Sequence, residues 1–447
     1  MTRKRHFRLA IGLLGFLVAV LALTVPASAE WKEKVLYSFQ GGTDGSTPAG
    51  GVVFDKQGNL YGATTDGGSS SCRGPFQCGT VYQLRPPDRK GDPWTETVLY
   101  VFKGSDFNDG ASPFGGLVWD QAGNLYGTTG YDGSGNCMLF GSRVGCGTVY
   151  QLKPPRVPGG AWTETVIYNF QGGNDGQLPV GDLVFDKEGN LYGATYYGGG
   201  FGSCNSPYDQ YCGTVFKLSP PRTKGGRKWK EKVLYEFKSG KDGANPNGGL
   251  VFDSKGAIYG TTYAGGNQNC KSDSSVGCGT AFKLKLPAST VWKETVFHRF
   301  SADEGNPSAG MTFDGMGYLY GTTVGLIFRF APPSTKSGRW REMILYTFNQ
   351  EAYGPEGALV FDKNRNAYGT TYSGNTFSGT VFRLKPPARE DGGWTFSILY
   401  GFSGTSDGAK PAAGLIFDKQ GNMYSTTQLG GTGACAFGCG TVFEVSP

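Results

Sequence analysis

Histidine is nearly absent from this chain: its 447 residues include two, and only His298 lies beyond residue 30. A Ser–His–Asp triad therefore has little to draw on, and no catalytic residues are predicted. Charged residues are also scarce, at 17%. Four of the six net positive charges lie in residues 1–29, which contain no acid, so the rest carries about +2. A surface this balanced gives no reason to expect a nucleic-acid partner.

Long hydrophobic runs are missing too, with one exception at the N-terminus. Residues 9–25 are apolar, follow a basic start, and lead to a small-residue cleavage site at Ala27-Ser28-Ala29. This order is typical of a signal peptide, so residues 1–29 are predicted to be removed and residues 30–447 to form one domain. An uncleaved membrane anchor is the alternative, but the run is short for a spanning helix. We expect a secreted or extracellular protein, with the periplasm as the alternative, and no membrane contact after cleavage.

Glycine is abundant, with 75 residues, and 38% of the chain is hydrophobic and 14% aromatic. This is enough apolar surface for a packed core, which argues against disorder. The ten cysteines fall into five local pairs, and in an exported chain such pairs are read as disulfides. Zinc sites are the alternative, but each needs four ligands, and histidine is lacking. The predicted pairs are Cys72/Cys78, Cys137/Cys146, Cys204/Cys212, Cys270/Cys278 and Cys435/Cys439.

The sequence repeats itself seven times, at intervals of 48–68 residues between successive tryptophans. The fixed segments are short, rich in Val, Ile, Thr, Tyr and Phe, and separated by Gly, Asp, Asn and Pro, as β-strands are. The tryptophans that open the copies are Trp31, Trp94, Trp162, Trp229, Trp292, Trp340 and Trp394. In the first copy the fixed segments are residues 31–39, 44–48, 51–55, 58–65 and 79–84.

Four strands per copy predict an all-β fold, a seven-bladed β-propeller of four-stranded antiparallel blades. Apolar residues on both faces of a strand, as in Val52-Val53-Phe54, suit a sheet packed between neighbouring sheets. We place residues 51–55 innermost in the blade and the tryptophan segment outermost. The first tryptophan segment then completes the last blade beside Gly440–Val445, which closes the ring and hides two sheet edges.

An Asp-x-x-Gly-Asn unit recurs between the first two strands of a copy, as at Asp55–Asn59 and Asp120–Asn124. Aspartate and asparagine supply oxygen ligands, so calcium sites are one interpretation. The other is a hairpin turn, in which glycine takes a positive φ and the aspartate accepts hydrogen bonds from backbone amides. Recurrence around the ring favours the turn.

These repeated segments resemble the GloVer (Gloeo_Verruco) tandem repeat of secreted bacterial proteins, over residues 31–447. The resemblance implies an exported repeat protein with a propeller-like fold, and it brings no catalytic residues to carry over. The matching segments in the first copy are Leu36-Tyr37-Ser38-Phe39, Asp44-Gly45 with Pro48, Phe54-Asp55, Gly58-Asn59-Leu60-Tyr61-Gly62 and Gly79-Thr80-Val81.

The loops between the second and third strands vary in length and contain all five cysteine pairs. Variable loops on a rigid scaffold commonly bind ligands, and disulfides reduce the entropy that binding costs. Aromatic side chains among Gly, Asn, Asp and Ser suit sugar rings, although packing between loops is the alternative for each. In the fifth copy only Thr323–Gly325 separate these strands, so the rim is expected to be low on one side. The candidate ligand-binding residues are Tyr131, Tyr197, Tyr263 and Tyr372, the last three assigned to one equivalent position, with Asp182, Asn247 and Glu356 near the channel mouth.

Two functions from different classes remain, because a propeller alone decides neither. The first is a non-enzymatic binding protein for extracellular polysaccharide or cell-wall glycan. The second is an enzyme, a hydrolase, lactonase or lyase, that uses Asp182 and Glu356, and close approach of these carboxylates would favour it. A purely structural matrix protein is a third interpretation. No cofactor or metal is predicted, with a divalent cation at the channel mouth as the open alternative, and the protein is expected to be a monomer.

Overall fold

In the computed structural model, Trp31–Pro447 form a compact unit. The predicted signal peptide, residues 1–29, lies outside the described residues. Within them, regular structure is strand apart from two 3-10 turns, η2 (Gly173–Asp175) and η3 (Gly240–Asp242), and no helix is long and apolar enough to cross a membrane. The residues described are 31–68, 78–104, 108–139, 141–157, 159–200, 212–222, 226, 228–267, 270–272, 275–287, 291–335, 338–389 and 392–447.

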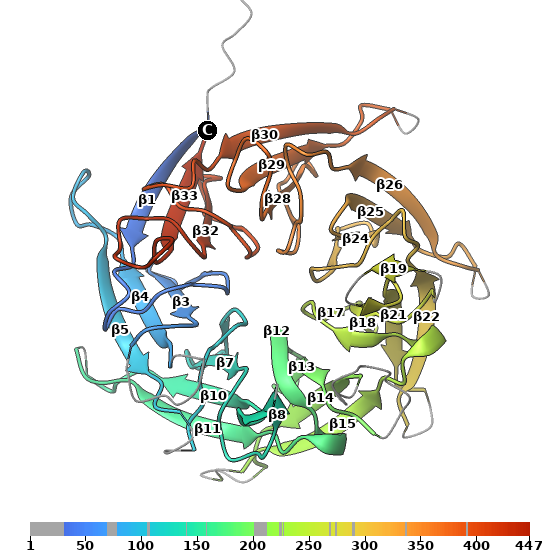
Figure 1. Ribbon diagram of the computed structural model, residues 1–447, viewed down its shortest axis with the longest axis horizontal. Coiled ribbons are helices and arrows are strands. Elements are labelled where there is room, and N and C mark those ends of the chain that lie inside the picture. Colours follow the sequence, from blue (N-terminus) through green and yellow to red (C-terminus); the bar gives the residue numbers. More distant parts are fainter. Residues whose placement is uncertain are drawn as a thin grey trace, which may run out of the picture. The chain divides into compact units, whose positions relative to one another are not determined.

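The strands form seven four-position antiparallel sheets, one for each blade of the propeller (Figure 1). The innermost strands of blades one to seven are β2 (Val53–Phe54), β6 (Val118–Trp119), β12 (Gln177–Phe185), β16 (Ala244–Pro246) with β17 (Val251–Phe252), β23 (Thr312–Phe313), β27 (Val360–Phe361) and β31 (Ile416–Phe417). The second strands are β3 (Leu60–Thr64), β7 (Leu125–Thr129), β13 (Leu191–Tyr197), β18 (Ile258–Ala264), β24 (Leu319–Thr322), β28 (Ala367–Thr371) and β32 (Met423–Thr427).

The outer half of each blade is a regular hairpin. The third strands are β4 (Thr80–Arg85), β10 (Thr148–Lys153), β14 (Thr214–Ser219), β21 (Thr280–Lys285), β25 (Leu326–Ala331), β29 (Thr380–Lys385) and β33 (Thr441–Ser446). The outermost strands are β5 (Thr95–Val101), β11 (Thr163–Asn169), β15 (Lys230–Glu236), β22 (Lys293–Arg299), β26 (Arg341–Thr347), β30 (Thr395–Gly401) and, in blade seven, β1 (Lys32–Ser38). Two small hairpins lie in the loops of blades two and four: β8 (Met138–Leu139) with β9 (Ser142–Arg143), and β19 (Lys271–Ser272) with β20 (Ser275–Val276).

The first strand of the chain closes the ring (Figure 1). β1 pairs antiparallel with β33, from Lys32 opposite Ser446 to Ser38 opposite Thr441. The last blade is therefore built from both ends of the compact unit, and no blade edge is left between the first and last copies. The predicted fold, its seven blades and this closure are confirmed.

Two features explain how the second and third strands fit together: a glycine in the second strand, and a pair of threonines, one from each strand. A Cβ atom on Gly62 would lie 2.3 Å from the hydroxyl oxygen of Tyr82, so only glycine lets that buried ring cross the neighbouring strand. The hydroxyl oxygens of Thr64 and Thr80 lie 2.9 Å apart at the end of the same pair of strands. This threonine pair recurs in every blade except the fifth and marks the register of the repeat.

Neighbouring blades pack through aromatic side chains. The Trp162 ring, which precedes β11 of blade two, lies 6.0 Å from the ring of Tyr61 in blade one, and Trp229 lies 5.8 Å from Tyr126 in the same way. Each buried cluster includes residues from adjacent blades. The core is therefore a set of radial layers between sheets, which is why both faces of each strand are apolar.

Asp120 shows how the Asp-x-x-Gly-Asn unit forms a turn. Its Oδ1 accepts hydrogen bonds from the backbone amides of Ala122 and Asn124 at 2.9 and 2.8 Å. Its Oδ2 accepts from the Asn124 side-chain amide at 2.6 Å and from the Tyr126 hydroxyl at 3.0 Å. Gly123 supplies the positive φ, 82°. The hairpin-turn interpretation is confirmed, and the carboxylate is fully used within the protein.

Replacing this aspartate should destabilise the propeller. Asp120→Ala removes four hydrogen bonds to a charged acceptor, so we expect a loss of about 2–3 kcal/mol in the free energy of unfolding, measured by urea titration. Asp88→Ala is the control, because the Asp88 side chain is 83% exposed and pairs only with Arg85 at the surface; it should cost less than about 0.5 kcal/mol. Equal effects of the two substitutions would contradict the turn's role.

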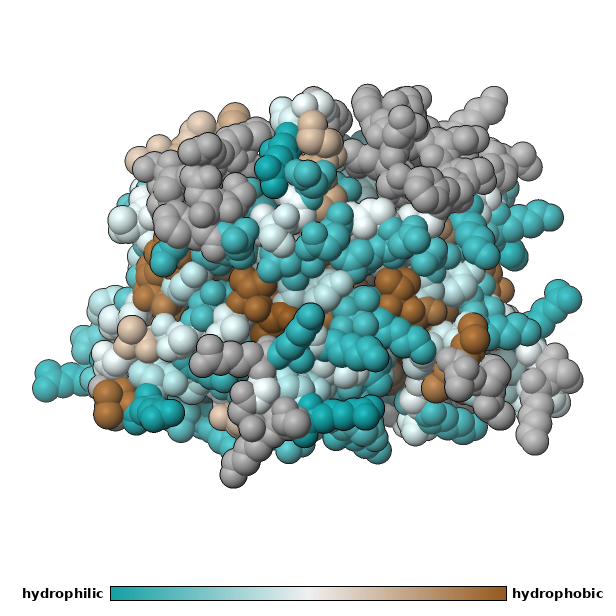
Figure 2. Space-filling view, turned by 90° about the horizontal axis from the view of Figure 1, so that it is seen from below, coloured by the Kyte–Doolittle hydropathy of each residue, from teal (hydrophilic) through white to brown (hydrophobic). Residues whose placement is uncertain are grey.

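The side wall of the ring carries hydrophobic residues as separate patches between hydrophilic ones (Figure 2). On the side shown, the described residues present no continuous apolar face.

Candidate functional site: the mouth of the central channel

A proline at the start of each innermost segment places the next residue at the mouth of the channel. These seven residues line one cavity of about 890 Å³ that occupies the channel. Below them the wall is mainly glycine: a Cβ atom on Gly115 would lie 2.5 Å from the carbonyl oxygen of Gly181 in the next blade. The wall is thus nearly uniform, while the mouth differs from blade to blade. The mouth residues are Ala49, Phe114, Val180, Asn247, Ser308, Glu356 and Ala412.

Disulfide-bonded loops hold this mouth in place. Leu178, just before the proline of blade three, has a φ of 56°, and its amide donates to the carbonyl of Cys146 at 3.1 Å. The amide of Thr47 donates in the same way to Cys439 at 2.8 Å. The structure contains the predicted disulfides Cys137–Cys146, Cys270–Cys278 and Cys435–Cys439. Cys78 and Cys212 are also disulfide-bonded, and their predicted partners Cys72 and Cys204 lie outside the described residues.

Aromatic side chains cover one arc of the mouth. Tyr131, Tyr196 and Tyr263, from blades two to four, line the cavity with Phe114. Phe114 packs against Tyr131 with ring centroids 5.7 Å apart, and Tyr196 packs edge-on against Tyr197 at 4.8 Å. Burial, with a smaller contribution from Tyr197, raises the pKa of Tyr131 to about 12, and burial also raises the pKa of Tyr196. These hydroxyls therefore stay protonated at neutral pH and can donate hydrogen bonds.

The threonine register corrects one sequence-based assignment. The second strand ends its paired stretch at an equivalent threonine in blades three, four and six. The residues that directly follow it are Tyr196, Tyr263 and Tyr372. Tyr197 lies one position further on and does not share their position. Neither Tyr197 nor Tyr372 is part of the cavity lining, and Tyr372 instead lies with its ring 4.9 Å from Nζ of Lys410.

Polar side chains occupy the adjoining arc, from blade four to blade six. Asn247 donates through Nδ2 to the carbonyl of Ser308 at 3.4 Å, and the Ser308 hydroxyl donates to the carbonyl of Pro355. Burial raises the pKa of Glu356, and Lys410 partly offsets this rise. The mouth therefore has an aromatic side and a hydrogen-bonding side, which the sequence analysis placed on one face without separating them.

Asp182 lies deeper, where the other blades have glycine or alanine. Its Oδ1 accepts a hydrogen bond from the Gly116 amide at 2.7 Å. The carboxylate reaches the lumen, but protein surrounds it on all sides, and this burial raises its pKa. Burial and the Gly116 amide account for the pKa of Asp182, whereas burial and Lys410 account for that of Glu356. The two carboxylates therefore share the cavity without acting as a pair.

A second group of polar residues recurs between the outermost strands of adjacent blades. Tyr100 of β5 donates to Asp109 at 2.8 Å, and Glu164 of β11 faces that aspartate. Burial and then Asp109 raise the pKa of Glu164 to about 8, while Lys103 opposes the rise. Five of the seven interfaces carry such a set: Tyr37/Asp44/Glu96, Tyr100/Asp109/Glu164, Tyr168/Asp175/Glu231, Tyr235/Asp242/Glu294 and Tyr400/Asp407/Glu33.

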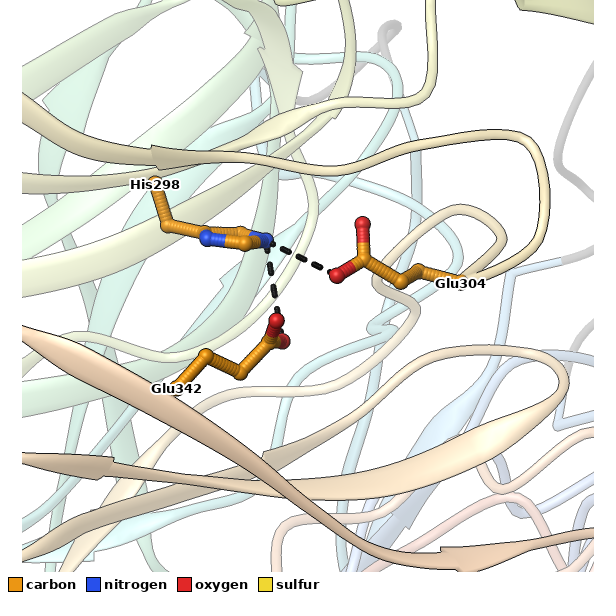
Figure 3. A group of neighbouring side chains, drawn as sticks. All are labelled: His298, Glu304 and Glu342. Carbon is orange, nitrogen blue, oxygen red and sulfur yellow. Dashed lines mark ion pairs between the residues drawn. The ribbon is translucent and has the colours of Figure 1, made fainter.

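Two interfaces depart from this pattern. Between blades five and six, Tyr346 and Phe396 stack with ring centroids 4.1 Å apart and an interplanar angle of 6°. Between blades four and five, His298, Glu304 and Glu342 take the three places (Figure 3). The sequence analysis treats His298 only as an isolated histidine. Alignment of the outermost strands would have found the group, since His298 stands where other copies have tyrosine.

Fold and cavity together define a closed seven-bladed β-propeller with one end of its central channel as the candidate binding site. The chain belongs to the Gloeobacter/Verrucomicrobia repeat family, whose model matches residues 22–202 and 135–336. No curated protein sequence matches it.

Several solved structures show a related arrangement. An oxidoreductase of Thermus thermophilus, described as a glucose dehydrogenase, aligns over 93% of this chain and 100% of its own, at 14% identity and a TM-score of 0.41. A family AA12 carbohydrate-active enzyme of Trichoderma reesei aligns over 94% and 96%, at 12% identity and a TM-score of 0.42. PorZ, a surface component of the type-IX secretion system of Porphyromonas gingivalis, aligns over 88% and 46%, at 14% identity and a TM-score of 0.48. At these levels none of them bears on the activity of this chain.

Proposed function

We propose that this protein is exported and binds a neutral segment of extracellular polysaccharide or cell-wall glycan at the channel mouth, without converting it. The observation that carries the proposal is the two-sided mouth, with Phe114, Tyr131, Tyr196 and Tyr263 on one arc. A sugar ring has C–H patches that pack on aromatic faces and hydroxyls that need hydrogen-bond partners. The adjoining polar arc, with Asn247, supplies such partners.

Two further features support binding rather than catalysis. A mouth held by disulfide-bonded loops and by positive-φ residues is rigid before the ligand arrives, which lowers the entropy lost on binding. The carboxylates of Asp182 and Glu356 do not perturb each other, whereas acid and base catalysis depends on paired groups with divided roles. Export is supported by the sequence of residues 1–29 and by the disulfides, which persist in oxidising compartments.

A glycan array of the purified protein, with a hydrolase and lyase assay on each retained glycan, tests the proposal. We expect retention of at least one polysaccharide fragment and no release of product. Absence of binding to any glycan would overturn the proposal, and product release would replace it with the enzyme interpretation.

Tyrosine substitutions then locate the site. Tyr196→Ala and Tyr263→Ala should each weaken binding of the retained glycan about tenfold, since an aromatic contact contributes about 1–1.5 kcal/mol. Tyr372→Ala is the matched control, because it occupies the equivalent position in blade six but lies outside the cavity lining. Titration calorimetry of the three variants measures the difference, and equal weakening by Tyr372→Ala would place the ligand elsewhere.

A further inference from the structure

The group formed by His298, Glu304 and Glu342 lies at the interface between blades four and five, called the notch below (Figure 3). His298 comes from β22, Glu342 from β26, and Glu304 from the loop that leaves blade four. Nε2 of His298 is 3.3 Å from Oε1 of Glu304 and 3.6 Å from Oε1 of Glu342. One ligand atom from each of the three residues lies within 4.8 Å of the other two. The side chains are only 13–20% exposed, so the notch shields them while leaving one side open.

Each side chain is held so that one atom faces the centre of the group. The backbone amide of Ser301 donates to Oε2 of Glu304 at 2.5 Å, which leaves Oε1 turned toward His298. The imidazole packs against Phe300 and Phe330, with ring centroids 4.7 and 5.2 Å away. Nε2 of His298 and Oε1 of Glu342 are buried, yet neither has a partner with hydrogen-bond geometry. Nε2 of His298 therefore meets the two carboxylates as ion pairs and not through hydrogen bonds.

The other interfaces show what is particular here. At five of them a tyrosine hydroxyl donates to an aspartate, as Tyr235 does to Asp242 at 2.5 Å. At this interface a nitrogen with a lone pair replaces the donating hydroxyl, and a glutamate on a shorter loop replaces the aspartate. The substitution turns a hydrogen-bonded set into three potential electron-pair donors that meet at one point.

We propose that this notch is a metal site that binds one Zn²⁺ through His298, Glu304 and Glu342, with water completing the coordination. Tetrahedral ligands about 2.0–2.1 Å from zinc lie roughly 3.3 Å from one another, which is close to the separations of 3.3 and 3.6 Å found here. Imidazole and carboxylate are both zinc ligands, whereas Ca²⁺ requires six to eight oxygens and Mg²⁺ a nearly ideal octahedron. The ion also offsets two adjacent negative charges in a sheltered notch.

The ion would add a link between the outermost strands of two blades that the polypeptide joins through the loop from β22 to β23. Blades five and six contain no cysteine, so the disulfides that fasten the loops of the other five blades are missing there. A ligand from each outermost strand and one from the connecting loop would clamp β22 to β26. The site is therefore structural, and it is independent of the glycan proposed for the channel mouth.

Zn²⁺ binding to the purified full chain, prepared without a polyhistidine tag, tests this proposal. Equilibrium dialysis with elemental analysis should give one Zn²⁺ per chain, and an excess of Ca²⁺ or Mg²⁺ should not displace it. Co²⁺, used as a spectroscopic probe of the same site, should give the visible absorption of a four-coordinate ion. Added Zn²⁺ should raise the unfolding temperature of the wild-type protein.

His298→Tyr is the matched variant, because tyrosine is the residue found at this position in the five regular interfaces. This variant should fold, its affinity for Zn²⁺ should fall at least tenfold, and added Zn²⁺ should not raise its unfolding temperature. Glu342→Gln should weaken binding by a similar factor, whereas Glu294→Gln, at the regular interface between blades three and four, should leave it unchanged. Zn²⁺ binding that survives His298→Tyr, or that is absent from the wild-type protein at micromolar concentrations, would overturn the proposal.

Discussion

Truncating Leu36 of β1 and Phe39, which directly follows this strand, should open the ring at blade seven. Leu36 and Phe39 are 6% and 0% exposed and pack into the cluster between blades seven and one. The double variant Leu36→Ala/Phe39→Ala should cost about 5–8 kcal/mol, most of the stability of an ordinary domain. Because β1 is the only neighbour on the outer side of β33, amide hydrogen exchange of Thr441–Ser446 should accelerate at least a hundredfold.

The corresponding variant in blade one separates ring closure from general destabilisation. Leu99→Ala/Phe102→Ala removes the equivalent side chains from β5, an outermost strand that follows its own blade in sequence. Exchange should then accelerate first in β4, with β33 still protected. If the β1 variant left Thr441–Ser446 protected, or if both variants exposed the same strands, the pairing of β1 with β33 would not be what closes the ring.

The propeller should be more stable at pH 5 than at pH 8.5. Burial and a neighbouring aspartate raise the pKa of Glu96 to about 7 and of Glu164 to about 8, and three other interfaces carry the same arrangement. Between about pH 4.5 and 8 the folded chain therefore holds protons that the unfolded chain has lost. Stability is fully present below the unfolded pKa and declines as pH rises through the folded values. The unfolding temperature should fall by an amount on the order of 5 °C over this range.

Scanning calorimetry at constant ionic strength measures this decline, and glutamine variants assign it. Glu164→Gln cannot ionise, so it should match the wild type near pH 5 and exceed it at pH 8.5. Because a neighbouring aspartate contributes to the raised pKa of each glutamate, the variants report that interaction as well as the ionisation of the glutamate. A stability that is level or rising from pH 5 to 8.5 would show that the carboxyl pairs carry charge in the folded protein.

The fold could be predicted from the sequence because the strands, the turns and the spacing of the copies all indicate a seven-bladed propeller. Seven tryptophan segments, alternating strands and turn residues such as Gly58 occur in phase, and the unpaired first segment predicts closure without any knowledge of coordinates. The same redundancy predicted the disulfides, since each second cysteine stands directly before a Gly-Thr that begins a strand.

The candidate site was only partly accessible. Tyr131, Tyr263, Asp182, Asn247 and Glu356 do line the channel cavity. The sequence-based assignment put Tyr197 beside Tyr263, although Tyr196 and Tyr263 each stand one residue after the threonine of the second strand. The threonine pairing confirms Tyr196 as the equivalent residue, and a shift of one position turns a side chain to the other face of a strand. The separate environments of Asp182 and Glu356 depend on blade geometry, which no spacing along the chain reveals.

The group formed by His298, Glu304 and Glu342 was missed for a different reason. His298 stands where the other copies have tyrosine, whereas Glu342 is the glutamate found two residues after the tryptophan in six of the seven copies. The two residues belong to different copies, so the outermost strands must first be placed around the ring before they meet. A repeat protein encodes its scaffold in what the copies share, and its particular chemistry in the few positions where one copy departs from the others. Asp182 in the channel and His298 in the notch are both departures of this kind.

A crystal structure of the protein with a glycan retained on the array tests the central claim most directly. The account predicts seven blades with β1 on β33, and a sugar ring at the channel mouth lying against Tyr131, Tyr196 or Tyr263. A sugar bound on the side wall or at the opposite end of the channel, in an otherwise identical propeller, would contradict it.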